Sequence, residues 1–429
     1  MSLPEAAPMT PPSPHQRLLL ANASVLACTG DEHERPFDGD ILIEGDRIAR
    51  VALGRLAVDA AAVRVIDLRG ATVLPGLGDA HVHTSWPLDF VFDHAAIAAT
   101  PEGRHMLDVA AVAATFLDSG YTTIIGAGTT QPEDDLRIKA AIDRGWLPGP
   151  RVIPSGPMIA AAEGLGGDGE MMQVAADAAQ LTEIVKRQCD QGARALKLFI
   201  SGDGVVPEFP SQDVYMDDEM LTAAVAEAGR HGAFLTTHAR GSLSVAMAAR
   251  TGVRIIHHAC FVDQAAITAL ERRKDDAWVC PGLHYLHQMT HGAARPYGIT
   301  DEKIDASGYH EEYRAQIEGM RLLRAAGVKF VAGGDFGHQW THHGSYAAEL
   351  QRYVDQVGLT PVEAIHTATR NIGQAAGLQA GVIAEGYLAD LLVVDGDPAT
   401  DITVLQDPAR RRAVLKDGAF AYLNPELYP

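Results

Sequence analysis

The stretch Leu74-Pro-Gly-Leu-Gly-Asp-Ala-His-Val-His83 lies where the pattern of this 429-residue chain changes. Before it, short apolar runs are interrupted by turn residues, and after it, short apolar runs alternate with helical segments. Because alternate residues of a strand point to the same side, His81 and His83 would present two imidazoles to one point. Two convergent imidazoles indicate a metal site, although a polar strand end would show the same spacing.

Strand-like and helical patterns alternate from this stretch onward. Eight such βα units over roughly 300 residues are typical of a (β/α)8 TIM barrel, an α/β fold whose active site lies at the carboxyl ends of the strands. The predicted strands are 73–78, 122–126, 151–154, 195–200, 234–238, 254–258, 278–281 and 329–334. The predicted helices include 102–117, 134–144, 175–189, 217–231 and 311–326.

Both ends of the chain have the pattern of β structure. Apolar runs fill the N-terminal part, where Gly45 and Asp46 mark a hairpin turn, and the C-terminal part repeats this style in Ala389-Asp-Leu-Leu-Val-Val394. We therefore expect the two ends to form one small β-sandwich domain together. The predicted boundaries are 1–16 for a disordered lead-in, 17–73 and 378–429 for the small β domain, and 74–377 for the barrel.

Composition argues against several classes of partner. The 35 Lys and Arg residues against 55 Asp and Glu give a net charge of -20, whereas nucleic-acid binding usually requires a basic surface. The 4 cysteines show no CxxC spacing, which favours reduced thiols and a cytoplasmic protein. The chain shows no basic start of a signal peptide and no apolar run of membrane-spanning length, so we expect no membrane partner. Its acidic net charge leads us to expect no nucleic-acid partner.

Chemically active side chains gather at the predicted carboxyl ends of the barrel strands. Each one alone has a structural explanation, as a hydrogen-bonded histidine, a lysine that reaches the rim, or an aspartate that caps a loop. Together, imidazoles and a carboxylate on one rim indicate Zn²⁺ or a similar divalent ion. These residues are His81, His83, Lys197, His238, His257, His258 and Asp335.

Several longer motifs accompany these residues: the stretch 74–83, Thr237-His-Ala-Arg, Ile255-Ile-His-His-Ala, Gly333-Gly-Asp-Phe-Gly, and the segments 358–371 and 381–398. Through these motifs, the chain from residue 17 to its end resembles the amidohydrolase superfamily. Within it, the chain is similar to the imidazolonepropionase-like hydrolases, which include Xaa-Pro dipeptidases, ochratoxin amidases, and molinate and phenylurea hydrolases. Molinate and phenylurea hydrolases tend to have Asn where this chain has His81, so their substrates are a less safe inference.

The resemblance implies a binuclear metal centre, with Zn²⁺ as the expected ion. A lysine that is desolvated among apolar neighbours has a lowered pKa and reacts as a free amine with carbon dioxide, so a carboxylated lysine is chemically reasonable here. His257 stands where many relatives have another polar residue, and we expect it to face away from the metals. The implied ligands are His81, His83 and Asp335 for the more buried ion, His238 and His258 for the second, and carboxylated Lys197 between them.

The implied reaction is hydrolysis of an amide-like C–N bond. A metal-bridging hydroxide would attack the carbonyl of an N-acyl amino acid, a dipeptide, or a xenobiotic amide or carbamate, with Asp335 as general base. By similarity to a tyrosine of related peptidases, Tyr285 would polarise that carbonyl. Two alternatives stay open: a heterocyclic ring hydrolase or deaminase, against which Lys197 counts, and a noncatalytic metal-stabilised binding protein.

Further polar residues follow the predicted strands and are candidates to contact a small-molecule substrate. A solvated polar loop or a structural ion pair would explain the same residues equally well. The family also leads us to expect a homo-oligomer. The candidate substrate contacts are Arg240, His284, His287, His338 and His343.

Overall fold

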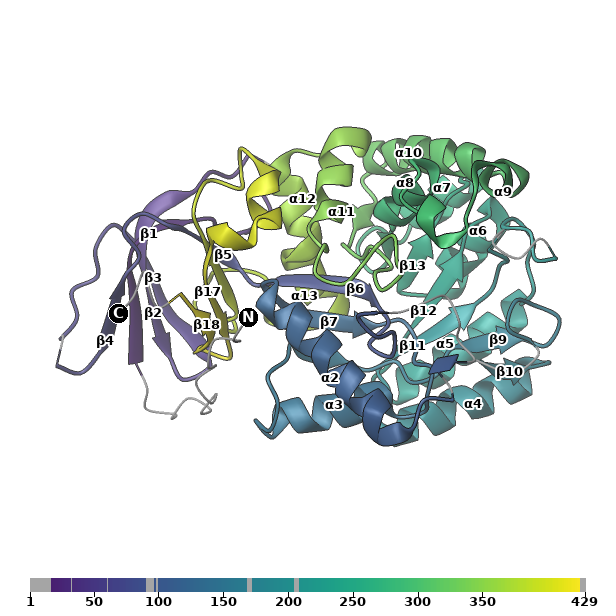
Figure 1. Ribbon diagram of the computed structural model, residues 1–429, viewed down its shortest axis with the longest axis horizontal. Coiled ribbons are helices and arrows are strands. Elements are labelled where there is room, and N and C mark those ends of the chain that lie inside the picture. Colours follow the sequence, from purple (N-terminus) through teal and green to yellow (C-terminus); the bar gives the residue numbers. More distant parts are fainter. Residues whose placement is uncertain are drawn as a thin grey trace.

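The computed structural model describes residues 17–31, 33–59, 61–89, 96–97, 99–167, 172–203 and 208–424. The predicted lead-in at 1–16 lies outside these residues. The described chain combines a mixed β-sheet, built from both chain ends, with a larger body of parallel strands and helices (Figure 1). A search of its helices for one with the length and hydropathy needed to cross a membrane finds none within the described ranges.

The mixed sheet joins the two chain ends, as the sequence predicts. Its strand β5 (Thr72–Pro75) pairs antiparallel with β16 (Leu391–Val394). Strand β1 (Arg17–Val25) is irregular between Leu20 and Ala23, so its first half pairs with β4 and its second half with β5. In the described chain, the strands of this one sheet run in the order β18 (Ala419–Leu423), β17 (Arg411–Lys416), β16, β5, β1, β2 (Phe37–Glu44) and β3 (Arg47–Leu53), with β4 (Arg64–Asp67) beside β1.

The α/β body contains two parallel sheets. Backbone hydrogen bonds connect their edges, since Ala80 donates to the carbonyl of Ala332 at 2.8 Å and Arg194 to that of Pro154 at 2.7 Å. One sheet has the order β6 (Leu77–Val82), β7 (Tyr121–Gly126), β8 (Arg151–Ile153). The other has the order β10 (Gln173–Ala175), β9 (Ile159–Ala161), β11 (Ala195–Phe199), β12 (Phe234–Ala239), β13 (Ile255–His258), β14 (Trp278–Cys280), β15 (Lys329–Phe330).

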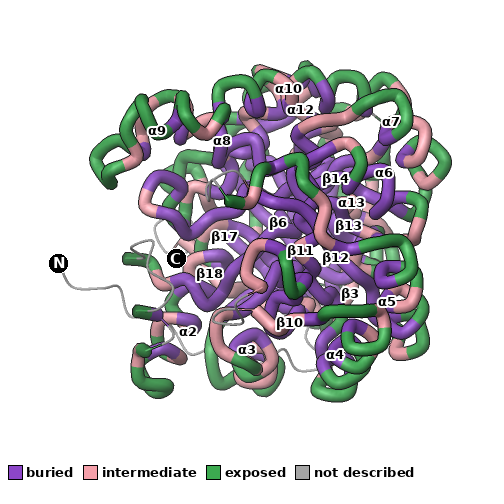
Figure 2. The backbone as a smooth tube through the Cα atoms, turned by 90° about the vertical axis from the view of Figure 1, so that its right-hand side faces the viewer, coloured by how far each residue is buried: buried purple, intermediate pink, exposed green. Residues whose placement is uncertain are grey.

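Helices surround these strands. In Figure 2 the buried strands β6, β11, β12 and β13 lie near the centre, and helices such as α3, α4 and α5 lie around them with exposed turns. The predicted helices are confirmed within a few residues, as α2 (Glu102–Asp118), α3 (Asp134–Asp143), α4 (Ala178–Gln191), α5 (Asp218–Arg230) and α10 (Tyr309–Ala325). The others are α6 (Ser242–Thr251), α7 (Gln264–Glu271), α8 (Leu283–Thr290), α9 (Asp301–Ala306), α11 (Ala348–Arg352), α12 (Pro361–Ala368) and α13 (Arg370–Ala376).

The first predicted strand, 73–78, is wrong because it spans two strands of different sheets. The break falls at Gly76, whose N–H donates to the carbonyl of Asp390 in the mixed sheet at 2.8 Å. A Cβ atom at Gly76 would lie 2.2 Å from the Thr122 hydroxyl oxygen, so only glycine fits this crossing. Consequently β5 belongs to the small sheet, and β6 opens the α/β body and carries His81.

Candidate metal centre

Three predicted ligands converge from the first and last strands of the α/β body. His81 lies on β6, His83 follows this strand, and Asp335 follows β15; all three are buried. The Asp335 Oδ1 atom lies 3.5 Å from His81 Nε2 and 3.4 Å from His83 Nε2. Since ligand atoms of a tetrahedral zinc ion with bonds of about 2.1 Å lie about 3.4 Å apart, these three residues fit a divalent ion.

The backbone at this site is strained. Asp335, His258 and Ala259 have φ angles of 54°, 71° and 47°, in the left-handed region that side chains other than glycine rarely adopt. Such residues cost about 1–3 kcal/mol each and concentrate at functional sites. Within β6, a side-chain oxygen of the buried Asp79 accepts the N–H of His81 at 2.8 Å.

The second pair of predicted ligands lies on β12 and β13. The rings of His238 and His258 are 4.5 Å apart, and ligand atoms of His258, His81 and Asp335 all lie within 4.8 Å of one another. His238 Nε2 is 3.0 Å from the carbonyl oxygen of Gly202. Burial holds the pKa values of these three histidines well below the ordinary value, so their rings are neutral and keep the lone pair that a metal ion requires.

Lys197 lies among the imidazoles of this site. This fully buried side chain on β11 places Nζ 3.3 Å from His81 Nε2 and in contact with His257 Nδ1. Burial lowers the pKa of Lys197 to about 7, against an ordinary value of 10.5. A substantial fraction of this amine is therefore uncharged near neutral pH and can react as a nucleophile.

The expectation that His257 faces away from the site is wrong. Its ring stacks on that of His81 with centroids 4.1 Å apart, while its Nε2 lies 3.1 Å from the carbonyl oxygen of Ala80. The strand register explains this position, because His257 pairs with His238 and paired residues of neighbouring strands share a face. The left-handed backbone at His258 then ends the alternation, so two successive histidines reach the site.

Asp335 keeps its negative charge in this buried position. Burial by itself would raise the pKa of Asp335, but the hydrogen bond from His83 and the nearby His338 and Lys197 lower it below the ordinary value of 3.8. An ionised carboxylate can bind a cation and accept a proton from water.

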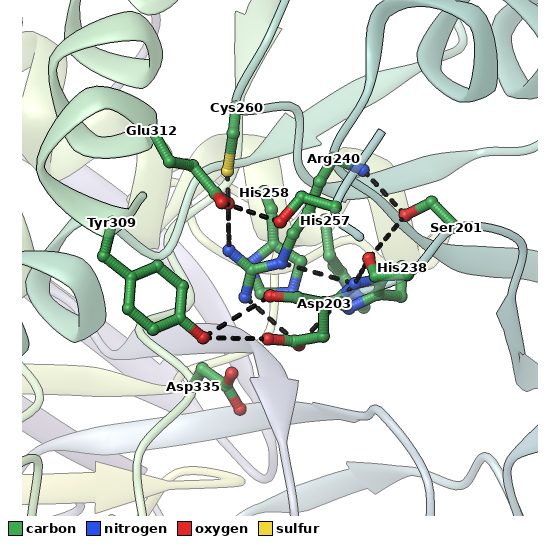
Figure 3. A network of polar contacts seen from close by, with 12 residues as sticks. Ser201, Asp203, His238, Arg240, His257, His258, Cys260, Tyr309, Glu312 and Asp335 are labelled. Atoms are coloured by element: carbon green, nitrogen blue, oxygen red, sulfur yellow. Dashed lines mark hydrogen bonds and ion pairs between the residues drawn. The ribbon is translucent and has the colours of Figure 1, made fainter. Parts of the chain in front are cut away.

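Arg240, a predicted substrate contact, is fully buried and already paired (Figure 3). Its guanidinium contacts Asp203 at 3.2 Å and Glu312 at 2.5 Å. The hydroxyl of Tyr309 donates to Asp203 Oδ1 at 3.3 Å, and Asp203 Oδ2 lies 3.7 Å from His238 Nε2. Two carboxylates thus pair with this arginine, which links α10 to the strand end at His238.

Tyr285 and His338 lie beside the candidate metal ligands. Tyr285 is buried on α8, with its ring 4.9 Å from that of His338. The Nδ1 atom of His338 is 3.2 Å from the backbone carbonyl of Asp335. His284, on the same helix, has its ring 5.7 Å from that of Phe336. The structure therefore brings these predicted substrate contacts to the segment that carries Asp335.

His287 and His343 interact with other parts of the chain. His287 Nδ1 is 3.0 Å from the Tyr313 hydroxyl, so it joins α8 to α10. His343 Nδ1 is 3.1 Å from the Tyr346 hydroxyl, and its Nε2 is 3.1 Å from the carbonyl of Trp86. Both ring nitrogens of His343 are thus engaged, and this histidine organises the loop in which it lies.

A family model covers the whole α/β body and, of the mixed sheet, strands β5, β16, β17 and the start of β18. The model of the Amidohydrolase family matches residues 72–420, which include every candidate ligand. The chain belongs to the amidohydrolase family. The resemblance read from the sequence motifs is thereby confirmed, and this amidohydrolase is a hydrolase that acts on carbon–nitrogen bonds.

Relatives of this amidohydrolase are similar over most of its length. Ochratoxinase from Aspergillus niger is 26% identical over 388 residues, which cover 82% of this chain and 75% of the relative. A prolidase solved with N-methylphosphonate-L-proline superposes with a TM-score of 0.84 at 25% identity, over 95% of this chain and 100% of that chain. Molinate hydrolase superposes with a TM-score of 0.77 at 18% identity, over 95% of either chain, which shows a common fold.

Sequence reasoning missed several residues of this amidohydrolase site. Asp203, Tyr309 and Glu312 surround Arg240, yet no motif marks them, because they reach the site from separate segments of the chain. The adjacent pair His257-His258 did carry a signal. Counting the register from His238 across to the next strand would have placed His257 inside.

Proposed function

We propose that this amidohydrolase hydrolyses an amide-like C–N bond of a small molecule, such as an N-acyl amino acid, a dipeptide, or a xenobiotic amide or carbamate. The observation that carries the proposal is the position of Asp335 Oδ1 within 3.5 Å of both His81 Nε2 and His83 Nε2. A carboxylate and two imidazoles at this spacing suit a divalent ion, and such an ion supports hydrolysis by water.

The proposed centre holds two divalent ions, with Zn²⁺ as the preferred assignment for imidazole and carboxylate ligands. Bound there, the ions supply an acidified water and polarise the scissile carbonyl. The neutral state of the buried histidines and the spacing of the Asp335 cluster support this assignment. The proposed ligands are His81, His83 and Asp335 for one ion, His238 and His258 for the other, and Lys197 for both.

Lys197 is proposed to carry a carbamate formed with carbon dioxide. Its amine is fully buried and lies 3.3 Å from His81 Nε2, where an ammonium ion would repel a metal. Reaction of Nζ with carbon dioxide forms an N–C bond, releases one proton and leaves a carboxylate. That carboxylate would offer one oxygen atom to each proposed ion.

Asp335 is proposed as the general base and then the general acid. Its ionised Oδ1 accepts a proton from water as the C–O bond forms, and returns it to the nitrogen as the C–N bond breaks. Tyr285 is proposed to donate a hydrogen bond to the carbonyl oxygen, and His338 and His284 to contact the substrate nearby. The contacts of Arg240, His287 and His343 instead favour a role in holding the loops around the site.

The two parallel sheets are proposed to form one (β/α)8 barrel at 74–377, with a small β-sandwich at 17–73 and 378–429. The hydrogen bonds that connect the sheet edges at Ala332 and Pro154 support a closed barrel, and the fork at β1 supports two layers in the small domain. A homo-oligomer and a cytoplasmic location stay predictions.

The proposal is tested by elemental analysis of unchelated protein together with a substrate panel. The panel contains N-acyl amino acids, dipeptides, anilides and carbamates, with separate detection of amine and ammonia. We expect near two metal ions per chain and release of the amine. One ion per chain with release of ammonia would favour a deaminase, and metal-free, inactive protein would refute the proposed centre.

A further inference from the structure

A large cavity lies beside the candidate metal centre. Its volume is about 940 Å³, near the upper end of the range for small-molecule sites. Helices α8, α9 and α10 and the segment between α8 and α9 contribute most of its wall. The wall is rich in aromatic rings, which are those of Phe261, Tyr285, Tyr297, Tyr309 and Trp340.

The cavity wall is connected to the candidate metal centre through two of its tyrosines, Tyr285 and Tyr309. On one side, the Tyr285 ring is 4.9 Å from the ring of His338, whose Nδ1 lies 3.2 Å from the backbone carbonyl of Asp335. On the other side, the Tyr309 hydroxyl contacts Asp203, which lies 3.7 Å from His238. Figure 3 shows the Tyr309 hydroxyl directed at Asp203, with Asp335 nearby.

The charged groups in this part of the cavity wall are paired with one another. Glu312 lines the cavity, but its carboxylate is held by Arg240 at 2.5 Å and by the Ser211 hydroxyl at 2.7 Å. Arg240 also faces Asp203 at 3.2 Å. This part of the wall therefore offers ring faces and charged groups that already have partners, and it favours a flat apolar group over a small charged one.

We propose that this cavity binds a flat aromatic substituent of the amide substrate and so makes bulky aromatic amides the preferred substrate class. The inference rests on the proposed hydrolase function, because the bond to be cleaved must reach Asp335 while the aromatic group lies among these rings. A methyl group in place of the aromatic group would leave most of the cavity without a partner, and kcat/KM would be about 100-fold lower.

The test compares two matched pairs of substrates on the metal-loaded enzyme. One pair is N-(2-naphthoyl)-L-alanine and N-acetyl-L-alanine, which differ on the acyl side of the amide. The other pair is L-alanine 2-naphthylamide and L-alanine methylamide, which differ on the amine side. We expect the aromatic member of one pair to exceed its methyl partner about 100-fold in kcat/KM, and the successful pair identifies the side of the amide that enters the cavity.

A cavity-filling variant tests whether the preference for aromatic substrates depends on this cavity. Ile299 lines its wall in the segment between α8 and α9, so Ile299→Trp reduces the space. We expect this variant to lower the aromatic-to-methyl ratio of kcat/KM at least about tenfold. Leu322→Trp, at an exposed position of α10 away from the cavity lining, is the matched control and should keep the wild-type ratio. Thermal melting verifies that both variants fold.

Direct binding separates this inference from the proposed function. Calorimetric titration with 2-naphthoate and with 2-naphthylamine should show binding to wild-type protein that is weakened by Ile299→Trp. Binding without hydrolysis of any substrate would retain the aromatic site and refute the hydrolase proposal. Hydrolysis with equal kcat/KM within both pairs, or a ratio unchanged by Ile299→Trp, would overturn the aromatic site and leave the hydrolase proposal standing.

Discussion

Asp335 combines three properties that seldom occur in one residue. It is buried, its backbone is in a left-handed conformation, and its carboxylate stays ionised between two histidines. A merely structural aspartate would not need a strained backbone, since many positions could cap the following loop. The strain is more simply explained by the direction in which the carboxylate must point.

Asp335→Asn should keep the fold and most of the bound metal but lose the proton acceptor. We expect kcat to fall about 1000-fold, within the range for removal of a general base. Steady-state kinetics and elemental analysis on the same sample measure the two effects. Asp218→Asn, at an exposed aspartate of α5, is the control. Unchanged turnover in a metal-loaded Asp335→Asn protein would refute the proposed base.

Carboxylation of Lys197 has a spectroscopic signature that does not depend on turnover. After equilibration with ¹³C-bicarbonate, we expect a carbamate carbon signal in the ¹³C NMR spectrum of the wild-type protein. The Lys197→Met variant should lack it, bind less metal and lose at least about 100-fold in kcat. Lys186→Met, at an exposed lysine of α4, should keep the signal. A wild-type spectrum without it in metal-loaded, active protein would contradict the carbamate.

Single residues were predictable where their role follows from position along one strand. His81, His83, Lys197 and Asp335 stand at strand ends that the hydrophobic pattern reveals, and the structure brings them together. The position of His257 depends on register between strands, which the pattern of one strand does not contain. The partners of Arg240 come from segments far apart in the sequence, so no local spacing predicts them.

At the scale of elements, a buried carboxylate from another helix caps the N-terminus of α8. Glu349 on α11 accepts the N–H groups of Leu283 at 2.9 Å and His284 at 2.6 Å, the first residues of α8. These donors would otherwise be unpaired at the helix start, and a carboxylate there also interacts favourably with the helix dipole. Because α8 carries Tyr285, this contact helps to position the candidate site.

Glu349 should make stability depend on pH. Burial raises the pKa of Glu349 to about 7 from 4.5, so the folded state holds this proton more tightly than the unfolded state. Its contribution is therefore fully present below pH 4.5 and is lost as the pH rises through about 7, by on the order of 3 kcal/mol. Urea unfolding from pH 4.5 to 8 should show a flatter profile for Glu349→Gln, whereas Glu318→Gln, exposed on α10, should follow the wild type.

The crossing between the two parts of the molecule depends on Gly76. In Gly76→Ala the added methyl group would overlap the Thr122 side chain, and we expect a loss of about 1–3 kcal/mol in the free energy of unfolding. Gly103→Ala is the control, because a Cβ atom there has no neighbour within 4 Å and helix α2 should gain about 0.5–1 kcal/mol. Equal stability of both variants in urea unfolding would contradict the crowding at Gly76.

Elements with strong periodicity were predictable, and those without it were not. The helices α2, α3, α5 and α10 match their predicted ranges because apolar residues recur along them at helical spacing. The two strands on either side of Gly76 form one apolar run in the sequence and were merged. Helix α8 is rich in histidine and was interpreted as a polar loop.

At the scale of the whole molecule, the two ends of the chain share one apolar core. Leu18, Ile41 and Val73 pack in the same buried cluster as Leu391 and Leu415. The repeated β pattern at both ends predicted this association. It could not predict the strand order, because pairing partners are selected by side-chain packing between segments that lie far apart in the sequence.

The pairing of β5 with β16 also sets an order of events during protein synthesis. Strand β5 leaves the ribosome before the α/β body, and β16 leaves it after that body is complete. Until then β5 has an open edge, where unpaired backbone groups can recruit other strands. The small sheet is therefore the last part of the molecule to be completed. A prematurely terminated chain would keep that open edge, and truncated products of this protein should aggregate or be degraded.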